Sequence, residues 1–273
     1  MECSHNPRKT GRSLINYGVN KTGVRAYKIK DRIMRQLLTP PHGNTKTNKA
    51  LSMGFANYIL HLAPHQASGF NVCPNASPGC IQSCLYSSGR ANWTYDKNGK
   101  LNPIRAARIE KTKLYYNDRA GFLAQLDKEI TLNKANARRK GLKPVFRLNG
   151  TSDIRWENHD IIQTHSDCTF YDYTKISNRR NLPGNYKLTF SRSEINDHET
   201  LVAFKNGMNV AVVFADSVPD MFRNRPVIDG DAHDLRFLDP KGYYIGLSAK
   251  GEAKQDQSGF VINYKAALNE VTL

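Results

Sequence analysis

The feature that most constrains the fold is a series of short apolar runs, each bounded by turn residues. Several runs are continuous rather than alternating, including "NVAVVFAD" at 209–216 and "YYIGLSA" at 243–249. Strands of a parallel sheet covered by helices on both faces have this pattern. The pattern predicts eight strands, at 55–63, 70–73, 145–150, 169–174, 187–193, 209–216, 227–231 and 243–249.

Helical segments are expected between these strands. Two are long, at 102–118 and 120–141, and shorter ones are expected at 157–164, 194–206 and 217–222. Strands that alternate with helices or loops predict an α/β protein, with a TIM-like (β/α)8 barrel, irregular or incomplete, as the leading architecture. The alternative is an open doubly wound sheet, but no glycine-rich phosphate fingerprint follows the first strand to support it.

The N-terminal segment differs from the rest in being polar, irregular and basic. Residues 1–50 contain eleven Lys or Arg residues against two acidic ones, in a chain of formal net charge +16. We expect a basic arm at 1–45, with a short helix near 24–38, attached to a single domain at 46–273. This skew favours a nucleic-acid partner, and the alternative is a basic surface that only keeps the protein in solution.

Location follows from what the sequence lacks. No apolar run approaches the ~18 residues of a membrane span, and no signal peptide opens the chain. We therefore expect a cytoplasmic protein with no membrane partner. The oligomeric state is left open.

Three of the five cysteines lie close together, as Cys73, Cys80 and Cys84 in "CPNASPGCIQSC". A disulfide is disfavoured in the cytoplasm, and core packing does not explain three cysteines in twelve residues. A tight turn that gathers thiolates predicts a metal site, with zinc ahead of an iron–sulfur cluster. The Cys-x6-Cys-x3-Cys spacing does not match the radical-SAM pattern. The candidates for a fourth ligand are His65, Cys3 and His5.

The expected strands end in polar residues. In a barrel, side chains at the carboxyl ends of the strands form the active site, so we expect one polar site on one face. Each residue alone has a structural alternative, such as a helix cap or a salt bridge from Arg192 to Asp153 or Glu194. The strand-end candidates are Asn149, Asp153, Tyr171, Asp172, Ser191, Arg192, Asp216, Asp229, Asp231 and Lys250.

Long motifs in the chain resemble a known family. "SGFNVCPNASPGCIQSCLYSSGR", "PVFRLNGTSDIRWE" and "PVIDGDAHDLRFLDPKG" resemble the bacteriophage and mobile-element family called gene product 88, over roughly residues 45–262. More distantly, that family resembles phage DNA 7-deazaguanine transglycosylases, which are similar to the tRNA-guanine transglycosylases, themselves (β/α)8 barrels. The resemblance implies a phage enzyme that exchanges guanine in DNA for a preQ0-type 7-deazaguanine. The zinc site of the tRNA enzymes has a different cysteine pattern and is not carried over.

The resemblance implies roles for the carboxylates. The nucleophile of these enzymes is an aspartate on a late barrel strand, which corresponds here to Asp229 or Asp231, with Asp153 as acid–base or base-gripping group. Asn149 and Asp172 would bond the base, and Tyr171 or Phe170 would stack on it. Ser191 and Asp216 complete the expected substrate site, and Arg192 and Lys250 would hold a phosphate.

Three alternatives stay open. A DNA glycosylase or other hydrolase would use the same carboxylates with water as the acceptor. A metal-cluster enzyme would use the three cysteines for redox or radical chemistry. A non-catalytic basic protein would only coat nucleic acid. An enzyme acting on a base must flip it from the duplex or bind single strands. Trp93 and Tyr95 are candidates to insert into the space that the flipped base leaves in the base stack.

Overall fold

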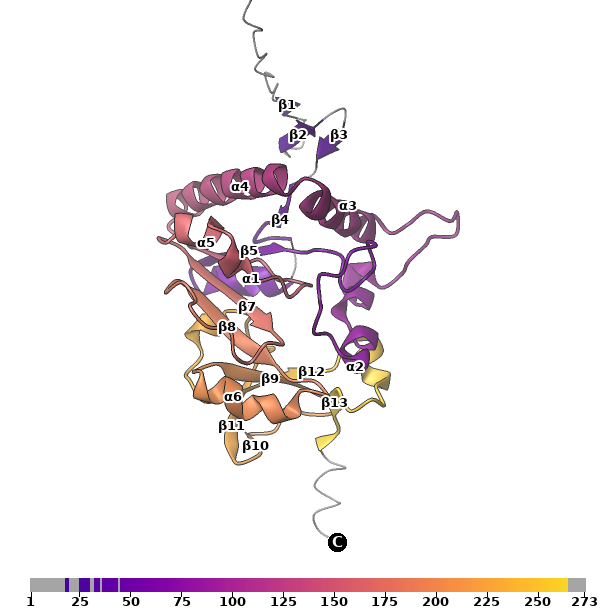
Figure 1. Ribbon diagram of the computed structural model, residues 1–273, viewed down its shortest axis with the longest axis vertical. Helices are drawn as coiled ribbons and strands as arrows, with labels where there is room; N and C mark the ends of the chain where they lie inside the picture. Colours follow the sequence, from indigo (N-terminus) through magenta and orange to yellow (C-terminus); the bar gives the residue numbers. More distant parts are fainter. Residues whose placement is uncertain (1–17, 20–24, 30–31, 35, 44, 265–273) are drawn as a thin grey trace, which may run out of the picture. The chain divides into compact units, whose positions relative to one another are not determined.

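The computed structural model describes residues 18–19, 25–29, 32–34, 36–43 and 45–264 and comprises two compact units, Met1–Gln36 and Leu37–Leu273. In the first unit, β1 (Gly18–Val19), β2 (Arg25–Ile29) and β3 (Arg32–Met34) form a three-stranded antiparallel sheet (Figure 1). The helix expected near 24–38 is therefore wrong. Most of the expected basic arm, with Cys3 and His5, lies outside the described residues.

The second unit is built on a ten-stranded sheet with the order β10-β11-β12-β9-β8-β7-β6-β5-β4, and β13 also pairs with β9. Pairing is parallel from β5 to β9 and on through β12 to β11, whereas β4 and β10 pair antiparallel at the two edges. The strands are β4 (Leu38–Thr39), β5 (Phe55–Leu60), β6 (Lys143–Arg147), β7 (Thr169–Thr174), β8 (Tyr186–Ser191), β9 (Asn209–Phe214), β10 (Met221–Phe222), β11 (Arg225–Asp229), β12 (Tyr244–Ser248) and β13 (Val261–Ile262).

The α/β class is confirmed, and the sheet is open, because within the described residues no pairing joins its two edges. Closure into a (β/α)8 barrel stays a prediction. The strand expected at 70–73 is wrong. There the Asn71 side chain accepts a bond from the Cys73 amide at 2.9 Å, and Ser68 Oγ bonds the Phe70 amide, so local turns replace a ladder. The helix expected at 217–222 is also wrong, since this stretch contains β10.

The two long helices expected at 102–118 and 120–141 are confirmed, and each begins at a side-chain cap. At the start of α3, the Asn102 side chain accepts a hydrogen bond from the Ile104 amide, and Pro103 lies in the first turn. Asp118 follows the end of α3, and its side chain accepts the Gly121 amide at the start of α4. The α-helices are α1 (Thr45–Ser52), α2 (Pro78–Gln82), α3 (Pro103–Asn117), α4 (Arg119–Arg139), α5 (Ile161–Thr164) and α6 (Thr200–Lys205). Short 3-10 helices are η1 (Leu85–Ser87), η2 (Gly89–Ala91), η3 (Trp156–Asn158), η4 (Asp197–Glu199), η5 (Arg236–Leu238) and η6 (Gly251–Gln255).

Alternation along β5–β7 separates two apolar layers. Tyr58, Phe146 and Phe170 stack in a row with ring centroids 5.4 Å apart, on the face we call the α4 face because Tyr58 Oη donates to the Asn133 carbonyl of α4. On the opposite face, the α1 face, Val145 and Tyr171 pack with Ala50 of α1 and Leu235. Side chains of successive strand residues therefore belong to different environments, which decides where each candidate residue points.

Candidate functional site

The cysteine segment contacts the loops that follow the carboxyl ends of three parallel strands. It begins against the loop after β6, where the Asp153 amide bonds the Val72 carbonyl at 2.8 Å. It continues past Glu194, after β8, which accepts a bond from the Gly79 amide at 2.8 Å. It reaches the loop after β12, where Ser83 Oγ lies 3.2 Å from Asp256. In Figure 1, α2 accordingly lies beside β12 and β13. Ligands bind at this edge of parallel α/β sheets.

Glu194 fixes the turn that carries Cys80. Its carboxylate accepts bonds from Ser77 Oγ at 2.7 Å and from the Gly79 amide, while Ser77 Oγ accepts the Cys80 amide and so caps α2. A Cβ at Gly79 would come within 2.1 Å of Ser258 Oγ. Glycine is therefore needed for this close approach, and the "SPGC" turn is held in one conformation.

The three thiols are close neighbours in a partly buried environment. Burial raises the pKa of Cys73 to about 12, and the nearby thiols of Cys84 and Cys80 add to the shift. Burial also raises the pKa values of Cys80 and Cys84, and Lys175 opposes the shift at Cys80 through its charge and a side-chain hydrogen bond. The three thiols are thus near enough to influence one another electrostatically, and their gathering into a metal site stays a prediction.

These thiols do not form a preassembled metal site in the part of the chain that the structure describes. Within the described residues, no three His, Cys, Asp or Glu side chains form a group that could hold a metal ion. Thiolates on one tetrahedral zinc lie about 3.8 Å apart, given a Zn–S bond of about 2.3 Å. The donor set fits a soft metal by its chemistry.

Lys175 places a positive charge beside the thiols. Its Nζ donates to Ser191 Oγ at 3.2 Å and to the Ser191 carbonyl at 3.3 Å, and it lies 5.3 Å from the centre of the Phe260 ring. Cys80 packs against the apolar cluster that contains Phe260. Ser191, a predicted site residue, thus positions this lysine. Lys175 follows β7 directly, and that position at a strand end was the signal that the sequence offered.

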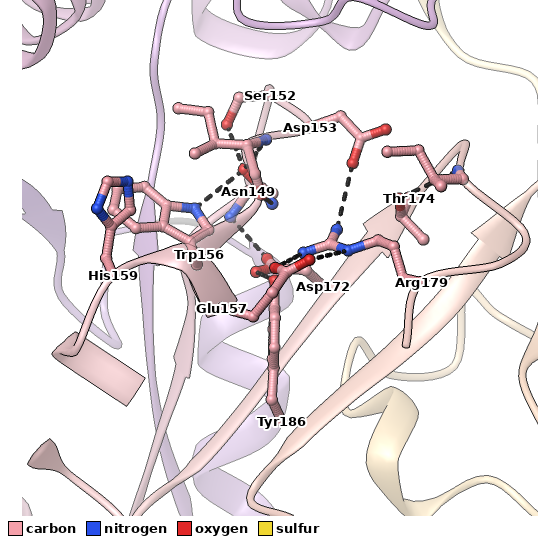
Figure 2. A network of polar contacts seen from close by, with 12 residues as sticks. Asn149, Ser152, Asp153, Trp156, Glu157, His159, Asp172, Thr174, Arg179 and Tyr186 are labelled. Carbon is pink, nitrogen blue, oxygen red and sulfur yellow. Dashed lines mark hydrogen bonds and ion pairs between the residues drawn. The ribbon is translucent and has the colours of Figure 1, made fainter. Parts of the chain in front are cut away.

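Asn149 and Asp153 belong to a polar network on the loop after β6 (Figure 2). Asn149 Oδ1 accepts bonds from Ser152 Oγ, the Ile154 amide and Trp156 Nε1, so this amide already has its partners within the loop. Asp153 accepts the Lys175 amide and pairs with Arg179 at 3.5 Å. Burial raises the pKa of Asp153 despite these partners.

Tyr171 and Asp172 face opposite sides of the sheet. Asp172 is fully buried and accepts bonds from the Asn149 amide at 2.6 Å and from Tyr186 Oη at 2.8 Å (Figure 2). Burial raises its pKa to about 7. Tyr171 lies on the α1 face, where its hydroxyl donates to Asp234, which also pairs with Arg147 at 2.9 Å. The two residues cannot line one site.

Asp229, Asp231 and Lys250 form a separate group at the end of β11. Asp231 accepts the Ser248 amide at 2.9 Å and pairs with Lys250, and Asp229 accepts the Asp231 amide at 2.8 Å. Burial opposes ionisation of Asp231, but the hydrogen bonds from Lys250 and Ser248 lower its pKa. Both carboxylates line an open pocket of about 350 Å³.

Asp153 lines a different pocket, of about 380 Å³. Tyr115, Tyr116, Arg119 and Arg155 also line it, and it shares no residue with the pocket of Asp229 and Asp231. The structure thus brings the cysteines close to Ser191 and Asp153, and leaves the late-strand aspartates in another pocket.

Two further candidates lie elsewhere. Arg192 is buried and bonds Asp197 and the Gly259 and Phe260 carbonyls, rather than Asp153 or Glu194. Asp216 is exposed after β9.

Several polar residues of the site region were missed from the sequence. His61 directly follows β5, Arg108 lies on α3, and Arg147 ends β6. A charged residue inside the apolar run "VFRLNG" was the available signal for Arg147, because it has to point into the protein with a partner. Nothing in the sequence marks Arg108 among the basic residues of α3.

Comparisons with known proteins give one match. A family model described as Gene product 88 matches residues 34–264. No curated protein and no solved structure matches the chain. Among the described residues, no helix is long and apolar enough to cross a membrane.

Proposed function

The chain belongs to the Gene product 88 family, as the resemblance to that phage family predicted, and from that premise we propose that it is a metal–thiolate enzyme. In this proposal Cys73, Cys80 and Cys84 hold an iron–sulfur cluster at the carboxyl edge of the sheet. The observation that supports it most is the position of the cysteine segment, which contacts the loops after β6, β8 and β12.

Three cysteine thiolates suit either the zinc ion that the sequence alone put first or an iron–sulfur cluster, and the proposal commits to the cluster. In a cluster each thiolate binds a different iron, so the thiolates lie farther apart than on one ion. The three thiols are near enough to influence one another but do not form a single-ion group among the described residues. Three thiolates leave one iron of a four-iron cluster without a protein thiolate.

The surrounding residues suit this role. Lys175 offsets the negative charge of thiolates, and Glu194 holds the turn that presents Cys80. When bound, such a cluster supplies electron transfer or a coordination position for a substrate. The chain's own part is to fix three thiols in a shielded place and to put a cation beside them.

The test is metal reconstitution of the full chain. Iron and sulfide are supplied anaerobically, and bound iron, acid-labile sulfide and visible absorption are measured. We expect a brown protein, and loss of the colour in Cys73→Ser, Cys80→Ser and Cys84→Ser. Cys168→Ser is the matched control, because Cys168 is a buried cysteine next to Asp167, away from this segment. Binding of one zinc per chain and no iron would overturn the cluster, and binding of no metal would overturn the metal site.

A second candidate keeps the base-exchange reaction inferred from the resemblance. The support for it is that Asp229 and Asp231 line one pocket. The pKa of Asp231 is lowered, which keeps its carboxylate ionised, as a nucleophile that attacks C1′ has to be. Its partners would be DNA and a free 7-deazaguanine. It also carries the prediction of a closed (β/α)8 barrel, for which the consecutive parallel strands from β5 to β9 are the support.

Nucleoside mass spectrometry separates the two candidates. The chain is expressed in cells that make preQ0, and digested plasmid DNA is examined for 7-deazaguanine deoxynucleosides. Base exchange predicts a modified nucleoside that Asp231→Asn abolishes and Cys80→Ser leaves at a measurable level. DNA that stays unmodified while preQ0 is present would rule this candidate out.

A further inference from the structure

Four buried donor groups lie without a hydrogen-bond partner near the carboxyl ends of β5, β6 and β7. Within the described residues these are His61 Nδ1, Arg108 Nε and Nη1, Arg147 Nε and Tyr173 Oη. Native proteins leave few buried polar groups unpaired, and a group of them in one place requires an explanation. A hydroxyl can rotate and a histidine can change tautomer, but the guanidinium groups can only donate.

The backbone brings these side chains together. Ile59 of β5 pairs with Arg147 of β6, and His61 follows two residues later on the same face. The His61 ring fills the space at Gly150, where a Cβ would lie 2.5 Å from Nδ1. The Arg147 guanidinium lies 4.6 Å from the centre of the Tyr173 ring on the next strand. Three neighbouring strands thus each contribute one of the four groups.

Arg108 approaches from α3. Thr112 Oγ1 accepts a bond from the Ala63 amide at 2.9 Å and donates to the Arg108 carbonyl at 2.8 Å, so α3 is attached to the chain just after His61. Arg108 is one turn from Thr112 and shares its face. Burial lowers the pKa of His61 well below its usual value, and the charges of Arg108 and Arg147 lower it further. Both arginines therefore lie near the imidazole.

The charge of this group is only partly balanced. Arg147 pairs with Asp234, but among the described residues no carboxylate pairs with Arg108, whose guanidinium lies 5.6 Å from the Tyr86 ring. A buried, unpaired guanidinium is costly, and a bound anion would offset that cost through charge-assisted hydrogen bonds.

We propose that His61, Arg108, Arg147 and Tyr173 form a subsite for an oxyanion, the phosphate or carboxylate group of a small-molecule substrate. The donor atoms are buried, so the backbone of a nucleic-acid duplex cannot reach them. Arg108 also lies 5.6 Å from the ring of Tyr86, which is two residues after Cys84. The anion would then be held next to the thiols, and only this placement of a substrate rests on the proposed function.

Anion binding by the full chain tests the subsite without any metal. Thermal unfolding and calorimetry are measured with inorganic phosphate and, separately, with acetate, at constant ionic strength. We expect saturable binding of at least one anion, weakened tenfold or more in Arg108→Gln and less in Arg108→Lys. Lys113→Gln is the control, because it removes the same charge from an exposed position on α3. The anion that binds more tightly identifies the source of the oxyanion.

Two outcomes would overturn the proposal. One is the absence of saturable binding of both anions, and the other is equal weakening in Arg108→Gln and Lys113→Gln, which would mean a general response of a basic surface. If Arg108→Gln does not fold, Tyr173→Phe serves instead, since it removes one unpartnered hydroxyl and should weaken binding several-fold. Binding that persists in Cys80→Ser would support the subsite even if the cluster proposal fails.

Discussion

At the scale of single residues, Asp172 gives the clearest dependence of the free energy of unfolding on pH. In the folded protein burial raises its pKa to about 7, from 3.8. Between these values the folded state keeps a proton that the unfolded chain has released, so this group lowers the free energy of unfolding as the pH rises. The slope is at most about 1.4 kcal/mol per pH unit. The loss is complete above the folded pKa.

Asp172→Asn should remove this dependence. An amide can still accept from the Asn149 amide and can donate to Tyr186 Oη, so the network keeps its shape. Urea unfolding is measured from about pH 4 to about pH 8. The free energy of unfolding of the variant should increase relative to that of the natural protein as the pH rises through this range. Asp216→Asn, an exposed carboxylate, is the control. Parallel pH profiles for the natural protein and Asp172→Asn would contradict the assignment.

At the scale of elements, the cysteine turn depends on one carboxylate. Glu194→Ala removes the acceptor for Ser77 Oγ and the Gly79 amide and should cost about 1–3 kcal/mol of stability. Because both bonds are to the α2 turn, amide hydrogen exchange should accelerate mainly at residues 77–84. Glu252→Ala, at an exposed position of η6, should leave the exchange unchanged. Acceleration spread evenly over the sheet would contradict a local anchor.

The elements were largely predictable because their signals are local. Continuous apolar runs gave seven strands, and Asn102 and Asp118 mark the starts of α3 and α4. The run at 70–73 failed because side chains of Ser68 and Asn71 bond the backbone there, which apolarity alone does not reveal. Strand order was harder, since β12 lies between β9 and β11 and no local signal encodes which strands become neighbours.

At the scale of the whole molecule, residues of the candidate site that are close in the chain could be predicted from the sequence, whereas those that only the fold brings together could not. Cys73, Cys80 and Cys84 were recognisable because they lie within twelve residues of the chain. Arg147 and Asp234 are 87 residues apart, and only the fold makes them partners. Asp153 and Asp229 were both placed at strand ends correctly, yet the ends of β6 and β11 are separated in the sheet order, so the residues line different pockets.

The Arg147–Asp234 pair holds the segment after β11 against the α1 face of the sheet, and its removal tests that long-range connection. Asp234 is fully buried and also accepts from Tyr171, so Asp234→Asn keeps an acceptor for that hydroxyl while it leaves Arg147 without a counter-charge. The loss of stability should be about 3–5 kcal/mol. Urea unfolding measures it.

The double variant Arg147→Met with Asp234→Asn decides whether the cost arises from the unpaired charge. Once the guanidinium is gone, the neutral amide has no charge left to balance, so the double variant should be more stable than Asp234→Asn alone. Additive losses from the two substitutions would mean that each residue stabilises the core through its own packing. In that case the pair would not be the connection between the segment after β11 and the sheet.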